Sequence, residues 1–221
     1  MGRVTTAPAF THEVMGEGFY EILLAVKRMS EQEDVIPVTL SERLMVDTEL
    51  KRGDVIAVEG QFRSYNKIEK GKSRLMLTVF VRDIVDFDEE RNPNIIELTG
   101  YVCKPTVYRT TPFKREICDI LIAVNRAYNK SDYIPCIAWG RNARFAGNLE
   151  VGDKITVTGR IQSREYQKRV TEEDVRTLTA YEVSVSKLAA YENAENFDTD
   201  AEFGFVDYSA AAGQAINVYT D

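Results

Sequence analysis

Apolar and polar residues alternate along most of the chain with the period of two that is typical of β-strands. In the second half this pattern predicts five strands, at residues 95–102, 116–128, 132–140, 152–166 and 177–188. A turn is expected at 129–131, and 141–149 reads as one or two helical turns. Pro135 lies inside the third strand, and because proline has no amide donor we expect it at a bulge or a sheet edge.

The third predicted strand is apolar on both faces. In "YNKSDYIPCIAWGR" (128–141), alternation places Tyr133 and Trp139 on one face and Cys136 and Ala138 on the other. Such a strand is either buried on both sides or keeps one apolar face for a ligand.

The chain contains an internal repeat. Residues 21–43 match 119–141 at an offset of 98 without a gap, and nine of the matched residues are identical. Residues 50–64 match 149–163 at an offset of 99. Two copies of one structural unit therefore follow each other along the chain.

Five strands with a short helix after the third are the element order of the OB-fold, a five-stranded Greek-key barrel. The sequence thus predicts an all-β chain of two tandem OB-folds, at 1–85 and 95–191, joined by a charged linker at 86–94. The first strand of repeat one is expected to be truncated, because only Met1 precedes the residue that matches Gly100. Periodicity is lost after residue 191, which predicts a disordered acidic tail at 192–221.

Charge is distributed unevenly along the chain, whose net charge is −7. Residues 1–92 carry 13 Lys and Arg against 17 Asp and Glu, residues 93–192 carry 15 against 12, and residues 193–221 carry none against 6. The second repeat is therefore basic, although the whole chain is acidic.

Several function classes find no support in the composition. No run of about 18 apolar residues and no signal peptide is seen, so we expect no membrane partner and a cytoplasmic protein. The three cysteines have no metal-ligand spacing and His12 is the single histidine, which predicts reduced thiols without a metal site. No phosphate-binding glycine loop or nucleophile–base pair is found, so no catalytic residues and no cofactor are expected.

Residues 94–190 resemble the bacterial single-stranded DNA-binding protein family. The resemblance rests on "LTGYV", "ILIAVNR", "WGRNA" and "LEVGDKITVTGRIQSR", together with Gly140, Gly152 and Gly159. It implies that bases stack on four aromatic residues, which are Tyr128, Tyr133, Trp139 and Tyr166. Aromatic rings offer every base a stacking face without sequence selection.

Basic residues near these rings are expected to contact phosphates and to make the affinity fall with salt. They are Arg126, Arg141, Arg144, Arg160, Arg164, Lys168 and Arg169. For Trp139 and Tyr128 a packing role is the alternative, and for the arginines an ordinary solvated charge. "REYQKR" (164–169) is expected to form a hairpin loop.

Repeat one resembles the same family more distantly. Ser30, Val35 and Ser41 replace Tyr128, Tyr133 and Trp139, and Lys67 stands opposite Tyr166. We therefore expect repeat one to bind single strands weakly or not at all and to serve in assembly or partner contact. The segment "YNKIEKGKSR" (65–74) still offers basic residues for a peripheral backbone contact.

The resemblance also implies partners. Family members assemble four OB-folds, so two per chain imply a homodimer. Their acidic tails dock replication and repair proteins through a terminal Pro–Phe, but this chain ends in "INVYTD". "DAEFGFVDY" (200–208) is either an internal substitute or part of a solvating tail.

Two functions follow from the sequence. The first is non-catalytic, sequence-tolerant binding of single-stranded DNA in replication, repair or recombination, by a nucleoid-associated protein. The second is an OB-fold interaction or assembly protein of the primosome-accessory kind, with secondary nucleic-acid binding. RNA binding uses the same stacking physics and is not separated from the first.

Overall fold

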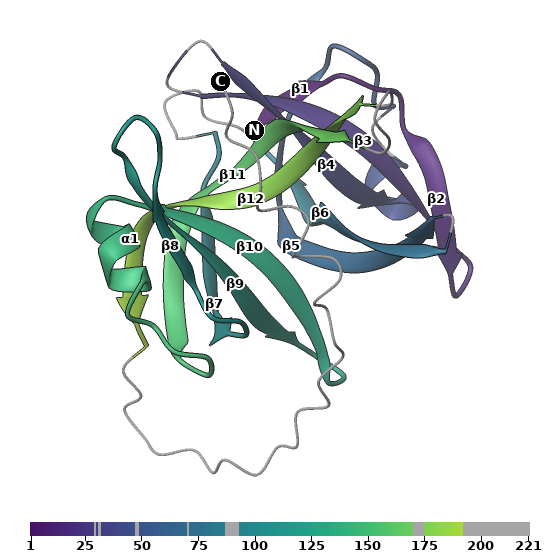
Figure 1. Cartoon of the computed structure of the whole chain (residues 1–221). Coiled ribbons are helices and arrows are strands. Elements are labelled where there is room, and N and C mark those ends of the chain that lie inside the picture. The colour runs from purple at the N-terminus through teal and green to yellow at the C-terminus, as the bar shows by residue number, and fades with distance from the viewer. Residues whose placement is uncertain are drawn as a thin grey trace.

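The structure is a computed structural model. It describes residues 1–28, 30, 32–46, 49–69, 71–86, 93–169 and 175–191. The predicted tail at 192–221 and most of the predicted linker lie outside these residues. Within them the chain forms two separate sheets, which we call the first and second barrel (Figure 1).

The first barrel contains β1 to β6. A ring of pairings runs β1-β5-β6-β4-β3 and closes between β3 and β1, while β2 extends the sheet beyond β3. The strands are β1 (Gly2–Val4), β2 (Ala9–Val14), β3 (Glu17–Lys27), β4 (Glu33–Ser41), β5 (Val55–Glu69) and β6 (Lys72–Val85), with a 3-10 helix, η1 (Glu42–Met45), after β4.

The second barrel repeats this arrangement. Its ring runs β7-β11-β12-β10-β9 and closes between β9 and β7, with β8 outside β9. The elements are β7 (Ile96–Val102), β8 (Val107–Thr110), β9 (Glu116–Arg126), β10 (Lys130–Trp139), α1 (Arg141–Ala146), β11 (Lys154–Arg169) and β12 (Val175–Ala190). In each barrel one pair is parallel, β4–β6 and β10–β12, and the other ring pairs are antiparallel. The prediction of two tandem OB-folds is confirmed.

Several local expectations were wrong. The β9–β10 turn spans residues 127–129, two residues earlier than expected. The segment 164–169 is strand, because the β11–β12 ladder continues to the pair Arg169 and Val175. Strands β2 and β8 were not predicted, since neither buries an alternating face. Pro135 lies in a β9–β10 ladder without a register shift, so the bulge was wrong, but it precedes the β10–β12 pairing that begins at Cys136, which agrees with the alternative of a sheet edge.

Two glycines at equivalent positions allow a close approach of neighbouring strands in each barrel. Gly60 in β5 and Gly159 in β11 both sit at a register shift. A Cβ at Gly60 would lie 2.3 Å from the carbonyl oxygen of Phe80, and one at Gly159 would lie 2.2 Å from that of Ser184. Only glycine lets the strands approach this closely, so the pair anchors equivalent points of β6 and β12.

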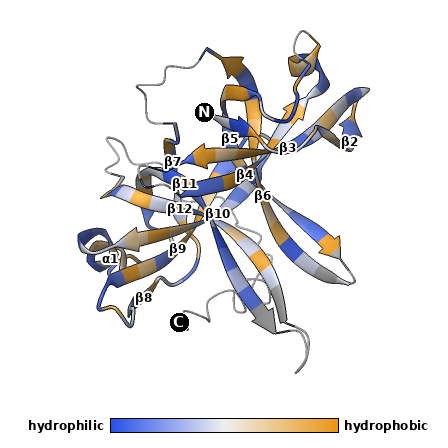
Figure 2. Ribbon diagram, turned by 90° about the horizontal axis from the view of Figure 1, so that it is seen from above, coloured by the Kyte–Doolittle hydropathy of each residue, from blue (hydrophilic) through white to orange (hydrophobic). Residues whose placement is uncertain are grey.

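The core of each barrel is aliphatic. Ile22, Val38 and Leu40 in the first barrel and Ile122 and Ile134 in the second are at most 1 % exposed. Figure 2 shows apolar and polar segments alternating along the strands, as expected when one face of each strand packs inward.

A pseudo-two-fold junction joins the barrels, with β11 passing beside β4 (Figure 1). The Ser163 amide donates to Asp34 Oδ1 at 2.8 Å, and the Val35 amide donates to Ser163 Oγ at 3.1 Å. The equivalent bonds in the opposite direction run from the Ser64 amide to Asp132 Oδ1 and from the Tyr133 amide to Ser64 Oγ, both at 2.7 Å. Repeat-equivalent residues therefore make equivalent contacts in both directions.

Candidate nucleic-acid interface

A hollow of about 330 Å³ opens on the outer face of the second barrel, and we call it the second-barrel hollow. Trp139 and Ser184 contribute to it from the neighbouring strands β10 and β12. Four arginines line it, which are Arg28, Arg115, Arg160 and Arg164. Within the described part of the chain no Asp or Glu lines this hollow, so a flat ring lies among positive charges.

Strand alternation explains the two apolar faces of β10. Ile134, Cys136 and Ala138 are at most 2 % exposed and fill the core. Trp139 lies on the opposite face and is half-buried, whereas Ile137 on that face is buried. One face thus packs into the barrel, and the other is open at Trp139, where β10 ends.

Arg164 links the hollow to Tyr166, another of the four predicted rings. Its guanidinium carbon lies 5.9 Å from the centre of the Tyr166 ring, within the range of a cation–π contact. Its Nε lies 3.7 Å from Glu182 Oε1, and this carboxylate also accepts a 2.7 Å bond from Gln162. Arg164 thus pairs with Glu182, lies beside the Tyr166 ring and lines the same hollow as Trp139.

Arg160 and Arg126 lie at the junction. Arg160 Nη1 is 2.8 Å from Asp34 Oδ2, and Arg126 Nε is 3.0 Å from Asp132 Oδ2. Arg28 also donates to Asp34, at 2.6 and 2.8 Å. Both arginines thus have a structural partner, and phosphate contacts from them stay predictions.

The charge state of Asp34 follows from these bonds. Burial raises the pKa of its carboxyl, but the bonds from Arg28 and the Ser163 amide, with the charge of Arg160, bring that pKa below its usual value. Asp34 is therefore ionised at neutral pH and balances part of the positive charge beneath the hollow.

Arg144 and Arg141 lie on α1. Arg144 is bound to Glu116 through Nε at 2.8 and 2.9 Å, and the Tyr108 hydroxyl donates to the same carboxylate at 2.6 Å. The bonds from Arg144 and Tyr108 lower the pKa of Glu116 to about 2. Arg141 is exposed at the start of the helix.

Of the remaining predicted residues, Tyr128 and Tyr133 do not line the hollow. Tyr128 is 94 % exposed at the tip of the β9–β10 hairpin, and the backbone of Tyr133 lies at the junction. Lys168 and Arg169 are on β11, but their side chains lie outside the described residues. The four rings therefore do not form one pocket.

Sequence reasoning missed two of the lining arginines. Arg115 precedes β9, and Arg28 comes from the first barrel. Arg28 is identical to Arg126 in the repeat, and this identity was a usable signal. Its place in the second-barrel hollow depends on how the barrels dock, which the repeat alone does not give.

Residues 93–190 match the model of the single-strand binding protein family. The matched residues are those of the second barrel. The match leaves out the first barrel, in agreement with its more distant resemblance.

Curated relatives and solved structures extend this finding. Single-stranded DNA-binding protein 1 of Staphylococcus aureus (strain COL) is 34% identical over 83 residues, which are 34% of this chain and 50% of the relative. Single-stranded DNA-binding protein 2 of Listeria innocua is 28% identical over 121 residues, 50% of this chain and 76% of the relative. The chain spans about half the length of the first relative.

The fold of the whole chain also has a solved counterpart. The wild-type single-stranded DNA binding protein from Thermus aquaticus superposes with a TM-score of 0.60 at 22% identity, over 89% of this chain and 93% of that chain. A deletion mutant of the same protein gives a TM-score of 0.63 at 21% identity, over 90% and 95%. The likeness concerns the fold and includes both barrels.

Other kinds of site find no counterpart in the residues described. No group of three or more His, Cys, Asp or Glu there is placed to hold a metal ion. Burial raises the pKa of the Cys136 thiol, which keeps it protonated. No helix in the same part of the chain is long and apolar enough to cross a membrane.

Proposed function

We propose that this chain is a non-catalytic, sequence-tolerant binder of single-stranded DNA that acts in replication, repair or recombination. The observation that carries the proposal is the second-barrel hollow, where Trp139 lies among four arginines in the barrel that matches the model of the single-strand binding protein family. A ring accepts any base by stacking, and guanidinium groups bind the phosphates on either side of it.

The geometry favours single strands over duplex. Trp139 lies in a concave site beside β11 and β12, and a base must leave its stack to reach a ring there. Unpaired strands present their bases without that cost. The arginines carry no sequence information, because phosphates are the same at every position.

The wider setting is part of the proposal. Two chains would assemble a homodimer with four OB-folds, and the acidic residues beyond 191 would contact replication or repair proteins. The protein would then act in the cytoplasm, associated with the nucleoid.

The proposal is tested by fluorescence anisotropy with a labelled oligothymidine and a duplex of equal length. We expect tight binding of the single strand and much weaker binding of the duplex. If the four arginines of the hollow each neutralise one phosphate, the slope of log K against log salt is about −3 for a single strand.

A pair of variants localises the binding. Trp139→Ala removes the ring from the hollow, whereas Tyr191→Ala removes a ring that stacks on Lys154 at the far end of β12. We expect a loss of affinity for Trp139→Ala alone. Equal binding of duplex and single strand, or equal effects of the two variants, would contradict the proposal.

A further inference from the structure

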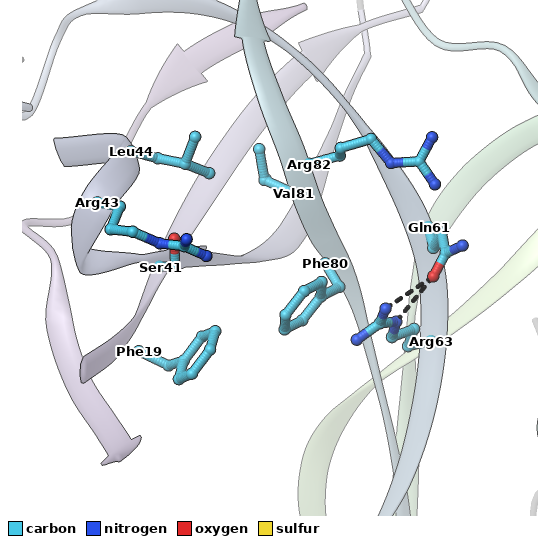
Figure 3. A pocket seen from close by; sticks show the side chains of 9 residues that line it. All are labelled: Phe19, Ser41, Arg43, Leu44, Gln61, Arg63, Phe80, Val81 and Arg82. Atoms are coloured by element: carbon cyan, nitrogen blue, oxygen red, sulfur yellow. Dashed lines mark hydrogen bonds between the residues drawn. The ribbon is translucent and has the colours of Figure 1, made fainter. Parts of the chain in front are cut away.

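The first barrel has a hollow at the place that corresponds to the second-barrel hollow. This first-barrel hollow has a volume of about 520 Å³ and is lined by two aromatic rings, Phe19 and Phe80, and by three arginines, Arg43, Arg63 and Arg82. Figure 3 shows both rings directed toward the same space, with Arg63 on the far side of Phe80. In the described residues no Asp or Glu lines it.

The pairing register shows that the two hollows are equivalent. Gln61 pairs with Phe80 across β5 and β6, just after the Gly60 register shift. Arg160 pairs with Ser184 across β11 and β12, just after the shift at Gly159. Phe80 is therefore the structural counterpart of Ser184.

The aromatic ring that borders the hollow lies on a different strand in each barrel. The second barrel has Trp139 on β10 and Ser184 on β12, whereas the first barrel has Ser41 on β4 and Phe80 on β6. Because β4–β6 and β10–β12 are the parallel pairs, both positions border the same hollow. A comparison of Ser41 with Trp139 alone suggests that the first barrel has lost its aromatic ring. The pairing register shows that Phe80 supplies a ring from the neighbouring strand β6.

The arginine beside the ring also occupies a different position in each barrel. Gln61 and Arg63 on β5 correspond to Arg160 and Gln162 on β11, so glutamine and arginine have exchanged places two residues apart. In both barrels the arginine donates to the glutamine, Arg63 Nη2 at 2.8 Å and Arg160 Nη2 at 3.1 Å. Arg63 is thereby held 3.7 Å above the Phe80 ring.

The rings form a continuous row. His12 and Phe19 stack with centres 4.9 Å apart and planes within 9°, and Phe19 lies 5.6 Å from Phe80. His12 belongs to β2, all of whose residues are exposed. The row leads from this edge strand to Arg63, and the side chains of Phe19 and Phe80 are only half-buried, so a series of bases can approach them.

The electrostatics favour an anion here. Burial lowers the pKa of the Arg63 guanidinium, and the positive charges of Arg126 and Arg82 lower it further against the opposing effect of Asp132. An approaching phosphate relieves this repulsion between like charges. Arg43 is paired with Glu17 through a side chain that is 80 % exposed, and such pairs hold their partners weakly.

We propose that the first-barrel hollow is a second binding site for the same single-stranded DNA, in which Phe80 and Phe19 stack bases and Arg63, Arg43 and Arg82 contact phosphates. This rests on the proposed function and replaces the expectation that repeat one binds weakly or not at all. The chain then binds one strand through both barrels, although residues 1–92 carry a net negative charge.

The test uses the full chain with a single tryptophan moved into the first barrel. In the double variant Trp139→Phe, Phe80→Trp, the indole at position 80 reports on the first-barrel hollow. We expect long oligothymidine to quench it and added salt to reverse the quenching. The number of nucleotides bound per chain at saturation should fall by about 4 to 16 for Phe80→Ala, the span of one OB-fold.

The control is Phe10→Ala, which removes a 60 % exposed ring on β2 that packs against Tyr20 and does not line the hollow. It should leave the nucleotide count unchanged. If DNA binds and quenches Trp139 in the unaltered chain, but neither the indole at position 80 nor the count for Phe80→Ala changes, this inference is overturned and the proposed function stands. If the unaltered chain binds no DNA, the proposed function itself fails.

Discussion

The two hollows contain the same chemistry in different arrangements. The second barrel has its ring on β10 and its arginine first along β11, whereas the first barrel has its ring on β6 and its arginine two residues later along β5. A comparison of Ser41 with Trp139 therefore suggests that the first barrel has lost an aromatic ring, whereas the structure shows a ring on the neighbouring strand instead. A binding surface depends on what borders the space, and neighbouring strands can supply it equally well.

The junction offers a second comparison between the barrels. Asp34 accepts bonds from Arg28, Arg160 and the Ser163 amide, whereas its counterpart Asp132 has an amide bond and the ion pair with Arg126. Both carboxylates are buried. The two carboxylates thus make the same kinds of contact, and within the described residues Asp34 has two arginine partners where Asp132 has one.

The largest predicted effect is at this junction. Asp34→Ala should lower the free energy of unfolding by about 3 kcal/mol, because it leaves two partly buried arginines without their anion. Asp132→Ala should cost about 2 kcal/mol, since fewer donors lose their acceptor. Urea denaturation of the full chain, followed by circular dichroism, measures both. Losses below about 1 kcal/mol in both variants would show that these bonds do not stabilise the junction.

The next effect concerns the exchanged rings. Trp139→Ser gives the second barrel the residue of the first, and should weaken oligothymidine binding roughly tenfold through the loss of one base stack of about 1–3 kcal/mol. Adding Ser184→Phe supplies the ring from β12 and should recover part of the loss. Anisotropy titration of the single and double variants decides this. A double variant no better than Trp139→Ser would mean that the position on the strand matters and the exchange is not functional.

The smallest effect is acid dependence at the helices. Glu17 is paired with Arg43 of η1 and is also bonded by Ser41, whereas Glu116 is paired with Arg144 of α1 and accepts a bond from Tyr108. The pKa of Glu116 is lowered from 4.5 to about 2, so its stabilisation is fully present above pH 4.5 and is lost as the pH falls toward about 2.

Thermal melts of matched variants measure this effect. Glu116→Gln should have a lower Tm than the unaltered chain at pH 7, and the gap should close between pH 4.5 and 2. Glu17→Gln should show a smaller gap at pH 7. A gap for Glu116→Gln that stayed constant down to pH 2 would rule out ionisation as its cause.

The sequence predicted the fold well because the repeat is strong. Nine identities between residues 21–43 and 119–141 define the two units, and period-two alternation gives their strands. Strands that bury no face, such as β2, leave no such signal. The length of the β11–β12 ladder was also missed, because polar residues such as those at 164–169 pair along their backbone as readily as apolar ones.

The site was predicted only in part. Trp139, Arg160 and Arg164 were identified and line the second-barrel hollow, whereas Arg28 and Arg115 were not. Phe80 could not be found by aligning the repeats, because its counterpart is Ser184 and its role depends on the parallel pairing of β4 and β6. Contacts across strands depend on the pairing register, and contacts between barrels depend on how the barrels dock. The residues of a single segment determine neither the register nor the docking.

The most direct test of the account uses Trp139, the single tryptophan of the chain. Its fluorescence is followed while the unaltered protein is titrated with oligothymidine at low and at high salt. The account predicts strong quenching at low salt and a weaker apparent affinity at high salt, because Trp139 stacks on a base among arginines. Unchanged emission under conditions where anisotropy shows the DNA to be bound would contradict it, and would make Trp139 a packing residue.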